Sequence, residues 1–115
     1  MKVTIYHNPR CSKSRQTLEL LGSQGIQPEI IEYLKTPPDR GALKNILKLL
    51  KMKPRDLIRK QEPIYREAGL DDGSLNDDQL LDAMLEHPVL IERPIVLANG
   101  KARIGRPPES VLEIL

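Results

Sequence analysis

The sequence contains no tryptophan, no phenylalanine and only three tyrosines. Modules that bind single-stranded RNA or DNA commonly stack the bases on aromatic side chains. This chain has too few aromatic rings for that mode of binding, so nucleic acid is not an expected partner. The scarcity of aromatic residues also predicts a core built from Leu, Ile and Val.

Cysteine is equally scarce, because Cys11 is the only one in the chain. No disulfide can therefore form within one molecule. Pro9, Arg10 and Lys13 interrupt the N-terminal region, which lacks the continuous apolar stretch of a secretory signal. No apolar run is long enough to cross a membrane. An unpaired cysteine without an export signal favours a reducing cytoplasm.

Neither sign of charge predominates, since 18 lysines and arginines stand against 16 aspartates and glutamates, for a net charge of +2. Proteins that bind nucleic acid usually carry a larger basic excess. The length of 115 residues fits a single compact domain over residues 1–115. One cysteine and two histidines, without the spacing of metal ligands, predict no metal site.

The N-terminal third of the chain predicts a strand, a helix and a second strand. Residues 3–6 are short and β-branched, which is typical of a strand, and Asn8 with Pro9 predicts a turn after it. A helix is expected from Ser12, with Gly25 as its C-terminal stop. A second strand at 28–33 follows at a distance that permits a parallel, right-handed crossover.

The middle of the chain, about residues 39–86, predicts a helical insertion. Thr36 precedes two prolines and Asp39, a sequence typical of a helix start with Thr36 as the N-cap. Asn76 and Gln79 have the spacing of a capping box at the start of a later helix. The expected buried stripes of these two helices are Leu43, Ile46, Leu47 and Leu50, and Leu80, Leu81, Met84 and Leu85.

The C-terminal part predicts a hairpin and a last helix. Asn99-Gly100 is a strong signal for a tight turn between strands at 95–98 and 101–104. Arg106 and the prolines after it then begin a helix. The residues of that helix expected to face inward are Val111, Leu112 and Leu115.

This order of elements is that of the thioredoxin-like fold. It predicts an α/β protein with a four-stranded mixed sheet, flanking helices and a helical insertion between strands 2 and 3. In this arrangement a cis proline at the start of the hairpin comes close to the active-site thiol, which makes Pro94 a candidate. About 5–6% of X-Pro bonds in folded proteins are cis, so the sequence alone does not establish that form.

Cys11 is the first candidate for chemistry. Free cysteine is often a small buried hydrophobe, but here the neighbours include Arg10, Lys13 and Arg15. A helix N-terminus beside cationic groups favours the reactive thiolate. Ser14 stands where a dithiol oxidoreductase has its second cysteine, so an outside thiol must resolve any adduct of Cys11.

Three further positions complete the candidate site. His7 precedes Cys11 on the same loop, where it could act on the thiolate or bond to the backbone with equal plausibility. Arg93 and Arg106 lie at the edges of elements that the fold places near this loop. Because arginine binds oxyanions through a planar fork of donors, we expect an anion site there.

Several stretches together resemble the glutaredoxin-linked arsenate reductase family of the ArsC type, in its short arsenate reductase-related subgroup. The match is collinear over essentially the whole chain. The stretches are residues 5–12 (Ile-Tyr-His-Asn-Pro-Arg-Cys-Ser), 57–60 (Leu-Ile-Arg-Lys), 77–80 (Asp-Asp-Gln-Leu), 87–96 (His-Pro-Val-Leu-Ile-Glu-Arg-Pro-Ile-Val) and 105–107 (Gly-Arg-Pro).

The resemblance implies a role for each matching residue. It implies that Cys11 is the nucleophile and that His7 supports its thiolate as a second catalytic residue. Asn8 and Pro94 match structural residues near the site, with Pro94 as the cis proline. The three oxyanion-binding arginines would be Arg59, Arg93 and Arg106, and only the resemblance selects Arg59 over Arg55 or Arg66.

The implied activity is reduction of arsenate to arsenite, with glutathione as co-substrate, glutaredoxin as reductant and no bound cofactor. We also expect a monomer without a membrane partner. Two alternatives stay open: an Spx-like regulator that binds RNA polymerase, and a glutathione-dependent thiol reductase. Ser14 argues against a self-contained Cys-x-x-Cys redox switch but not against a binding role.

Overall fold

The structure of the protein, a computed structural model, describes residues 2–115. The chain divides into two compact units. One contains the residues up to 36 together with 93–115, and the other contains residues 37–92. The candidate thiol belongs to the first unit, and the insertion expected from the sequence forms the second.

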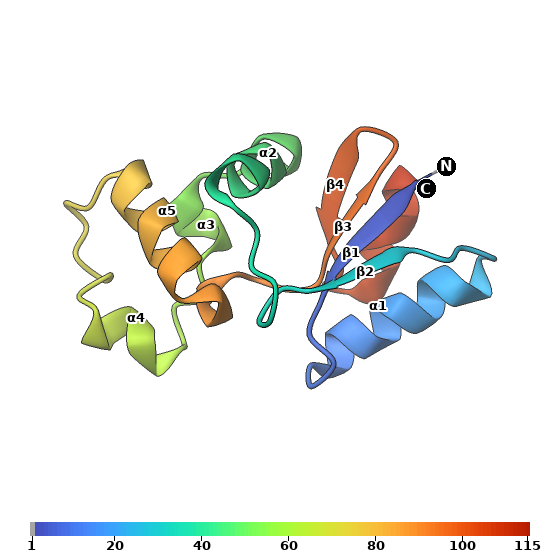
Figure 1. The fold of residues 1–115 in the computed structure, drawn as a ribbon, viewed down its shortest axis with the longest axis horizontal. Helices are drawn as coiled ribbons and strands as arrows, with labels where there is room; N and C mark the ends of the chain where they lie inside the picture. The colour runs from blue at the N-terminus through green and yellow to red at the C-terminus, as the bar shows by residue number, and fades with distance from the viewer. Residues whose placement is uncertain (1) are drawn as a thin grey trace. The chain divides into compact units, whose positions relative to one another are not determined.

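The first unit is built on a four-stranded sheet in the order β2-β1-β3-β4 (Figure 1). The strands are β1 (Val3–His7), β2 (Glu29–Glu32), β3 (Ile95–Ala98) and β4 (Lys101–Ile104). β1 runs parallel to β2 and antiparallel to β3, and β3 pairs with β4 in an antiparallel hairpin. This is the mixed sheet that the sequence predicts.

Helix α1 (Ser12–Ser23) and the short helix η2 (Pro108–Ile114) pack on one face of this sheet. α1 ends as expected, since Gly25 follows its cap with a φ of 75°, a conformation that glycine adopts at little cost. The core on this face is aliphatic, as predicted. It consists of Val3, Ile5, Leu21, Val96, Ala98, Val111 and Ile114.

The last helix differs from the expectation in its type. It is a 3₁₀ helix, and Leu112 is 41% exposed whereas Ile114 is buried. A 3₁₀ helix has three residues per turn, so Val111 and Ile114 share the inward face. The prediction of Leu112 as an inward residue assumed the α-helical period and was wrong.

The turn between β3 and β4 confirms the hairpin prediction. Asn99 and Gly100 have φ values of 54° and 71°. Two consecutive positive φ angles are typical of a type I′ turn, whose twist matches that of the strands. Asn99 Nδ2 also donates a hydrogen bond of 2.8 Å to the carbonyl of Ile114, which ties the turn to the end of η2.

The second unit is helical and lies between β2 and β3 in the sequence. Its elements are α2 (Arg40–Leu50), α3 (Pro54–Leu57), α4 (Pro63–Glu67), α5 (Asp77–Glu86) and the 3₁₀ turn η1 (Pro88–Leu90). Among residues 2–115, no helix combines the length and the apolar character needed to span a bilayer.

The start of α2 corrects one prediction. Asp39, not Thr36, is the N-cap, because its carboxylate accepts the N–H of Ala42 at 2.8 Å. Thr36 and Pro37 each precede a proline, which disfavours helical angles, so the helix begins only after Pro38. In contrast, the capping box of α5 forms as predicted, with reciprocal hydrogen bonds between residues 76 and 79.

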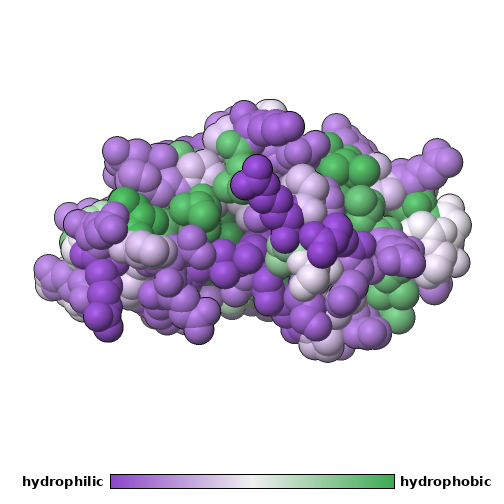
Figure 2. Space-filling model, turned by 90° about the horizontal axis from the view of Figure 1, so that it is seen from below, coloured by the Kyte–Doolittle hydropathy of each residue, from purple (hydrophilic) through white to green (hydrophobic). Residues whose placement is uncertain are grey.

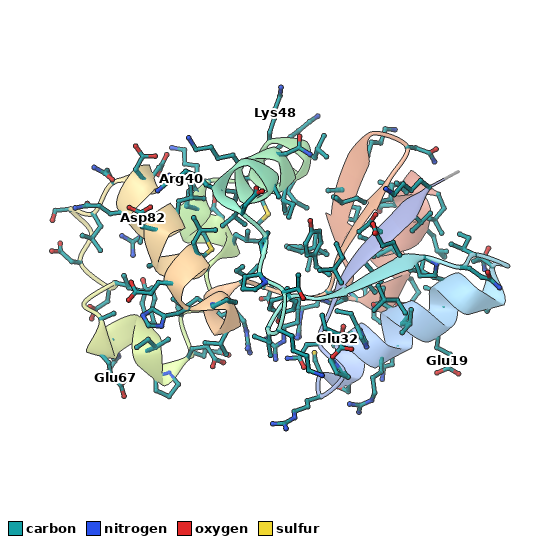
Figure 3. The ribbon with its side chains drawn as sticks, in the orientation of Figure 1. Glu19, Glu32, Arg40, Lys48, Glu67 and Asp82 are labelled. Carbon is teal, nitrogen blue, oxygen red and sulfur yellow. The ribbon has the colours of Figure 1, made fainter. Side chains whose placement is uncertain are left out.

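Polar contacts stabilise the second unit between its elements. Arg40 of α2 forms ion pairs with Asp78 and Asp82 of α5. Figure 3 labels Arg40 and Asp82 of this cluster. Arg55 of α3 donates to the hydroxyl of Tyr65 at 2.8 Å and also to two backbone carbonyls of the loop before α5.

Leu50 and Leu85, both expected to be buried, are only half-buried. On the face drawn in Figure 2, hydrophilic side chains predominate and apolar ones form separate patches.

Candidate active site

Cys11 is the N-cap of α1, at the junction that the sequence predicts. Its backbone is extended, with a φ of −93° and a ψ of 123°. Its N–H donates to the carbonyl of Asn8 at 3.0 Å, and its carbonyl accepts the N–H of Arg15 at 3.0 Å. Cys11 therefore occupies the end of the helix at which the first-turn N–H groups have no partners inside the helix and favour negative charge.

The loop before Cys11 is held by its own hydrogen bonds. The side-chain carbonyl of Asn8 accepts the N–H of Arg10 at 3.0 Å, and the guanidinium of Arg15 donates to the carbonyl of Pro9 at 2.9 Å. These bonds link the loop to itself and to α1. The position of Cys11 is thus set by short-range contacts, although the residue is only 7% exposed.

Arg106 lies directly against the thiol. Its Nη2 is 3.3 Å from Cys11 Sγ, and its Nε donates to the carbonyl of Arg93 at 2.8 Å. The bond from Nε to the Arg93 carbonyl fixes the plane of the guanidinium, and Nη2 then points at the Cys11 sulfur. A cationic group in this position stabilises a thiolate, and the fold brings these two predicted residues together.

Arg93 and Arg106 occupy equivalent places in two neighbouring turns. Each precedes a cis peptide bond, to Pro94 and to Pro107 respectively. The cis bond before Pro94 agrees with what the family resemblance implies. No feature of the sequence indicated that the bond before Pro107 is also cis. The N–H of Gly105 donates to the carbonyl of Pro94 at 2.9 Å, which joins the two turns. Nε and Nη1 of Arg93 are buried.

Gly105 is a residue that the reasoning from chemical motifs did not single out. A Cβ atom at this position would lie 2.4 Å from Thr17 Oγ1 and 2.8 Å from Pro94 Cγ. The turn after β4 can therefore approach α1 only because residue 105 has no side chain. In the sequence the only signal was that a glycine stands immediately before Arg106. The importance of this glycine depends on its contact with a residue that is distant in the sequence.

His7 is the last residue of β1 and is buried. Its Nδ1 is 2.6 Å from Ser14 Oγ, which also accepts the N–H of Asn8 at 3.0 Å. Burial lowers the pKa of His7 below its usual 6.5; Glu32 opposes this change and Arg15 reinforces it. The neutral imidazole is therefore the favoured form near pH 7.

Arg59 belongs to the second unit. Its N–H donates to the carbonyl of Leu90 at 2.7 Å. Its side chain is 18% exposed and pairs with Glu62 at 2.8 Å and with Glu92 at 3.6 Å. In the structure this guanidinium is thus engaged by two carboxylates, and its role in oxyanion binding stays a prediction.

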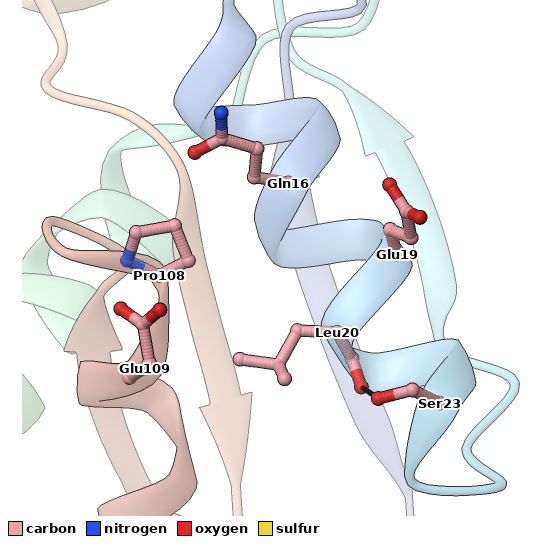
Figure 4. A pocket seen from close by; sticks show the side chains of 6 residues that line it. All are labelled: Gln16, Glu19, Leu20, Ser23, Pro108 and Glu109. Carbon is pink, nitrogen blue, oxygen red and sulfur yellow. Dashed lines mark hydrogen bonds between the residues drawn. The ribbon is translucent and has the colours of Figure 1, made fainter.

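Two hollows lie on the first unit. One of about 350 Å³, between α1 and η2, carries the carboxylates of Glu19 and Glu109, which would repel an oxyanion (Figure 4). The other, of about 210 Å³, lies beside the loop that precedes Cys11. Its lining residues are His7, Asn8, Pro9, Arg10, Glu32, Leu34 and Lys35.

The sheet order and the flanking helices define a thioredoxin-like fold, and the free cysteine Cys11 stands at the start of its helix α1. The ArsC family model matches residues 6–114. The uncharacterized protein YfgD of Escherichia coli K12 is 56% identical over 115 residues, which cover 99% of this chain and 97% of that protein. The chain therefore belongs to the ArsC family.

Two other relatives match along nearly their whole length. An arsenate reductase of Neisseria meningitidis serogroup B strain MC58 is 50% identical over 115 residues, 99% of this chain and 98% of that protein. The structure of an arsenate reductase from Vibrio cholerae is 56% identical and has a TM-score of 0.97, with 100% of this chain and 98% of that chain covered.

Proposed function

We propose that the protein is an arsenate reductase in which the Cys11 thiolate attacks the arsenic atom of bound arsenate. The observation that carries this proposal is the 3.3 Å contact between Arg106 Nη2 and Cys11 Sγ at the N-terminus of α1. A nucleophile held beside a guanidinium fork suits attack on a tetrahedral oxyanion. The names of the Neisseria and Vibrio relatives support arsenate as that oxyanion.

The proposed oxyanion site uses two kinds of donor. The first-turn N–H groups of α1 and the dipole of the helix favour a bound anion. Arg106, and with it Arg93 on the adjoining turn, would donate to the arsenate oxygens. Arg59 would supply the third guanidinium, as the family resemblance implies.

Two electrons must reach arsenic, and external thiols would supply them. Cys11 displaces one arsenate oxygen, which leaves as water, and glutathione displaces a second, so that both sulfurs are bound to As(V). A glutaredoxin thiolate then attacks the glutathione sulfur, and the electron pair of the broken S–As bond reduces arsenic to As(III). Water replaces Cys11, and arsenite and a glutathione–glutaredoxin disulfide are released.

A coupled assay tests the proposal. Arsenate, glutathione, glutaredoxin and glutathione reductase are mixed with the protein, and NADPH consumption is followed. We expect arsenate-dependent turnover by the wild type, none by Cys11→Ser, and normal turnover by Ser12→Ala, which changes an exposed serine next to Cys11.

The same assay separates the alternatives. Turnover with a glutathione mixed disulfide but none with arsenate would assign the protein as a thiol reductase. The absence of both activities, with co-purification of RNA polymerase, would assign it as a regulator. Either result would overturn the arsenate proposal.

A further inference from the structure

Thr17 is a buried polar residue in the middle of α1 that neither the motifs nor the family resemblance selected. The residue is 0% exposed, although it carries a hydroxyl group. That hydroxyl donates to the carbonyl of Lys13 at 2.8 Å, and the same oxygen lies 3.5 Å from the carbonyl oxygen of Gly105. Thr17 therefore contacts both its own helix and the turn that follows β4.

The hydrogen bond to Lys13 fixes the orientation of the Thr17 side chain. A threonine in a helix divides between two rotamers, because its hydroxyl can bond to a carbonyl one turn earlier. A hydroxyl has only one hydrogen to donate, and the shorter bond goes to Lys13. The approach to Gly105 at 3.5 Å is thus mainly a packing contact, at the long limit of hydrogen bonding.

Both branches of the Thr17 side chain face the place where Gly105 lacks a side chain. A Cβ atom built at residue 105 would clash with Thr17 Oγ1 and would lie 3.1 Å from Thr17 Cγ2. The backbone of the turn therefore rests against the hydroxyl and the methyl group together. Because protein interiors are close-packed and a change of even one methylene is felt, the shape of this side chain sets how near the turn lies to α1.

The distance between α1 and this turn determines the geometry of the thiol contact. Cys11 caps the helix that contains Thr17, and Gly105 immediately precedes Arg106. The Arg106 guanidinium is held within its turn by the bond from Nε to the carbonyl of Arg93 at 2.8 Å. Its Nη2 consequently lies 3.3 Å from Cys11 Sγ only while the turn keeps its place against the helix.

We infer that Thr17 is a positioning residue, whose two-branched side chain acts as a spacer between α1 and the turn and so holds Arg106 in contact with Cys11. The spacer acts through its shape, and the bond to Lys13 keeps that shape in one orientation. The inference deepens the proposed function and rests on its assignment of Cys11 as the nucleophile. It concerns the reactivity of the thiol, which is measurable without arsenate.

Alkylation by iodoacetamide, followed against pH, tests the spacer, because Cys11 carries the only thiol in the chain. Thr17→Ala removes both branches, so Arg106 is no longer held at its distance from the sulfur. We expect the pH of half-maximal alkylation to rise by about 0.5–1 unit, as for a cation displaced by about 1 Å at an effective dielectric constant of about 20. An unchanged midpoint in folded Thr17→Ala protein would overturn the inference.

Two conservative variants separate shape from hydrogen bonding. Thr17→Val keeps both branches without the hydroxyl, and valine has one preferred rotamer in a helix, so its midpoint should be that of the wild type. Thr17→Ser keeps the hydroxyl without the methyl group, and its midpoint should rise, by less than that of Thr17→Ala. A wild-type midpoint in Thr17→Ser together with a raised one in Thr17→Val means that the hydroxyl acts, and the spacer is then wrong.

A double variant tests whether Thr17 acts through Arg106. In Arg106→Ala protein the cation is absent, so the addition of Thr17→Ala should not raise the midpoint further. If Thr17→Ala shifts the midpoint equally with and without Arg106, the effect does not pass through the guanidinium and the inference fails.

Val3→Ala is the matched control for loss of packing. It also removes both branches of a buried β-branched side chain, at the end of β1 remote from the Cys11 loop. It should lower the free energy of unfolding and leave the alkylation midpoint unchanged. A midpoint raised as much as in Thr17→Ala would assign the shift to general loosening of the fold, against the inference.

These outcomes are independent of the substrate. A protein that does not reduce arsenate but shows the expected alkylation midpoints would disprove the proposed function and retain the spacer. Normal arsenate turnover with an unshifted midpoint in Thr17→Ala would do the opposite. Circular dichroism spectra establish that each variant compared is folded.

Discussion

Arg106 in the first unit has different partners from Arg59 and Arg40 in the second unit. In the first unit Arg106 donates to a sulfur and to a backbone carbonyl. In the second unit Arg59 pairs with two glutamates, and Arg40 pairs with two aspartates. A guanidinium beside carboxylates has part of its positive charge compensated, whereas Arg106 is directed at the sulfur, which is negative in the attacking thiolate.

This difference separates structural arginines from candidate ligands better than position in the sequence does. Ion pairs with exposed carboxylates contribute little to stability, typically 0–1 kcal/mol, but they reduce the attraction of the site for a second anion. Arg59 must give up part of its pairing with Glu62 and Glu92 before it can bind an oxyanion. The predictions that follow test this contrast.

Removing Arg106 should have the largest effect on activity. Arg106→Ala takes away a donor from both the thiolate and the proposed oxyanion, and loss of one such donor commonly lowers catalysis by about a hundredfold or more. Arg106→Lys should recover only part of the loss, because it restores the charge but not the fork. The measurement is kcat/KM for arsenate in the coupled assay.

Arg103→Lys provides the matched control for Arg106→Lys. Arg103 lies on the same hairpin and donates to Glu113 at 2.9 Å, so its charge is already compensated. We expect its replacement to change kcat/KM by less than about twofold, as for a surface ion pair. Equal losses from the two substitutions would remove the distinction between the arginines.

A methyl group at Gly105 should have the next largest effect. In Gly105→Ala the new Cβ meets Thr17 and Pro94 at distances that require one of them to move, which should destabilise the protein by about 1–3 kcal/mol. The turn that carries Arg106 would shift with it, so kcat/KM should fall about tenfold even in protein that remains folded, in line with the sensitivity of catalysis to a misplaced group.

Gly22→Ala is the control for the cost of the methyl group itself. Apart from its chain neighbours and the backbone of its own helix, nothing lies within 4 Å of a Cβ built at Gly22, and the residue is inside α1. Alanine there should stabilise the protein by about 0.5–1 kcal/mol, because glycine is the poorer helix former. Chemical unfolding measures both variants, and a Gly105→Ala protein as stable and active as the wild type would contradict the close-approach argument.

The fold was largely predictable because its signals are local. The Asn99-Gly100 turn, the Gly25 stop and the capping box of Asn76 and Gln79 each depend on residues a few positions apart, and each formed as expected. The errors arose where two local rules competed. At Thr36 a favourable cap was overridden by consecutive prolines.

The sequence predicted which residues form the candidate site but not the contacts between them. Cys11 and Arg106 are separated by most of the chain, and their contact depends on the approach of the β4–η2 turn to α1, which Gly105 permits. Ser14 was interpreted through the cysteine it replaces, while its burial and its bond to His7 became visible only in three dimensions.

Weakening a carboxylate partner of Arg59 should have a smaller effect, with the opposite sign. Glu62→Gln removes the charge that lies 2.8 Å from Arg59. If Arg59 binds arsenate, the KM for arsenate should fall about two- to threefold, because a partly compensated cation is released, as expected for the weak energies of solvent-accessible ion pairs. Glu67→Gln on α4 is the control, since Glu67 is exposed. An unchanged or raised KM in Glu62→Gln would assign Arg59 to structure alone.

The smallest effect concerns the titration of His7, which is buried at the end of β1. Its pKa is lowered from 6.5 in the folded protein, chiefly by burial, so the unfolded chain binds the proton more tightly than the native state does. The free energy of unfolding should therefore be highest above about pH 6.5 and fall as the pH decreases through the folded-state pKa of His7. His7→Asn cannot titrate, and its unfolding free energy should lose this component of the pH dependence. Parallel curves for the two proteins would mean that folding does not change the pKa of His7.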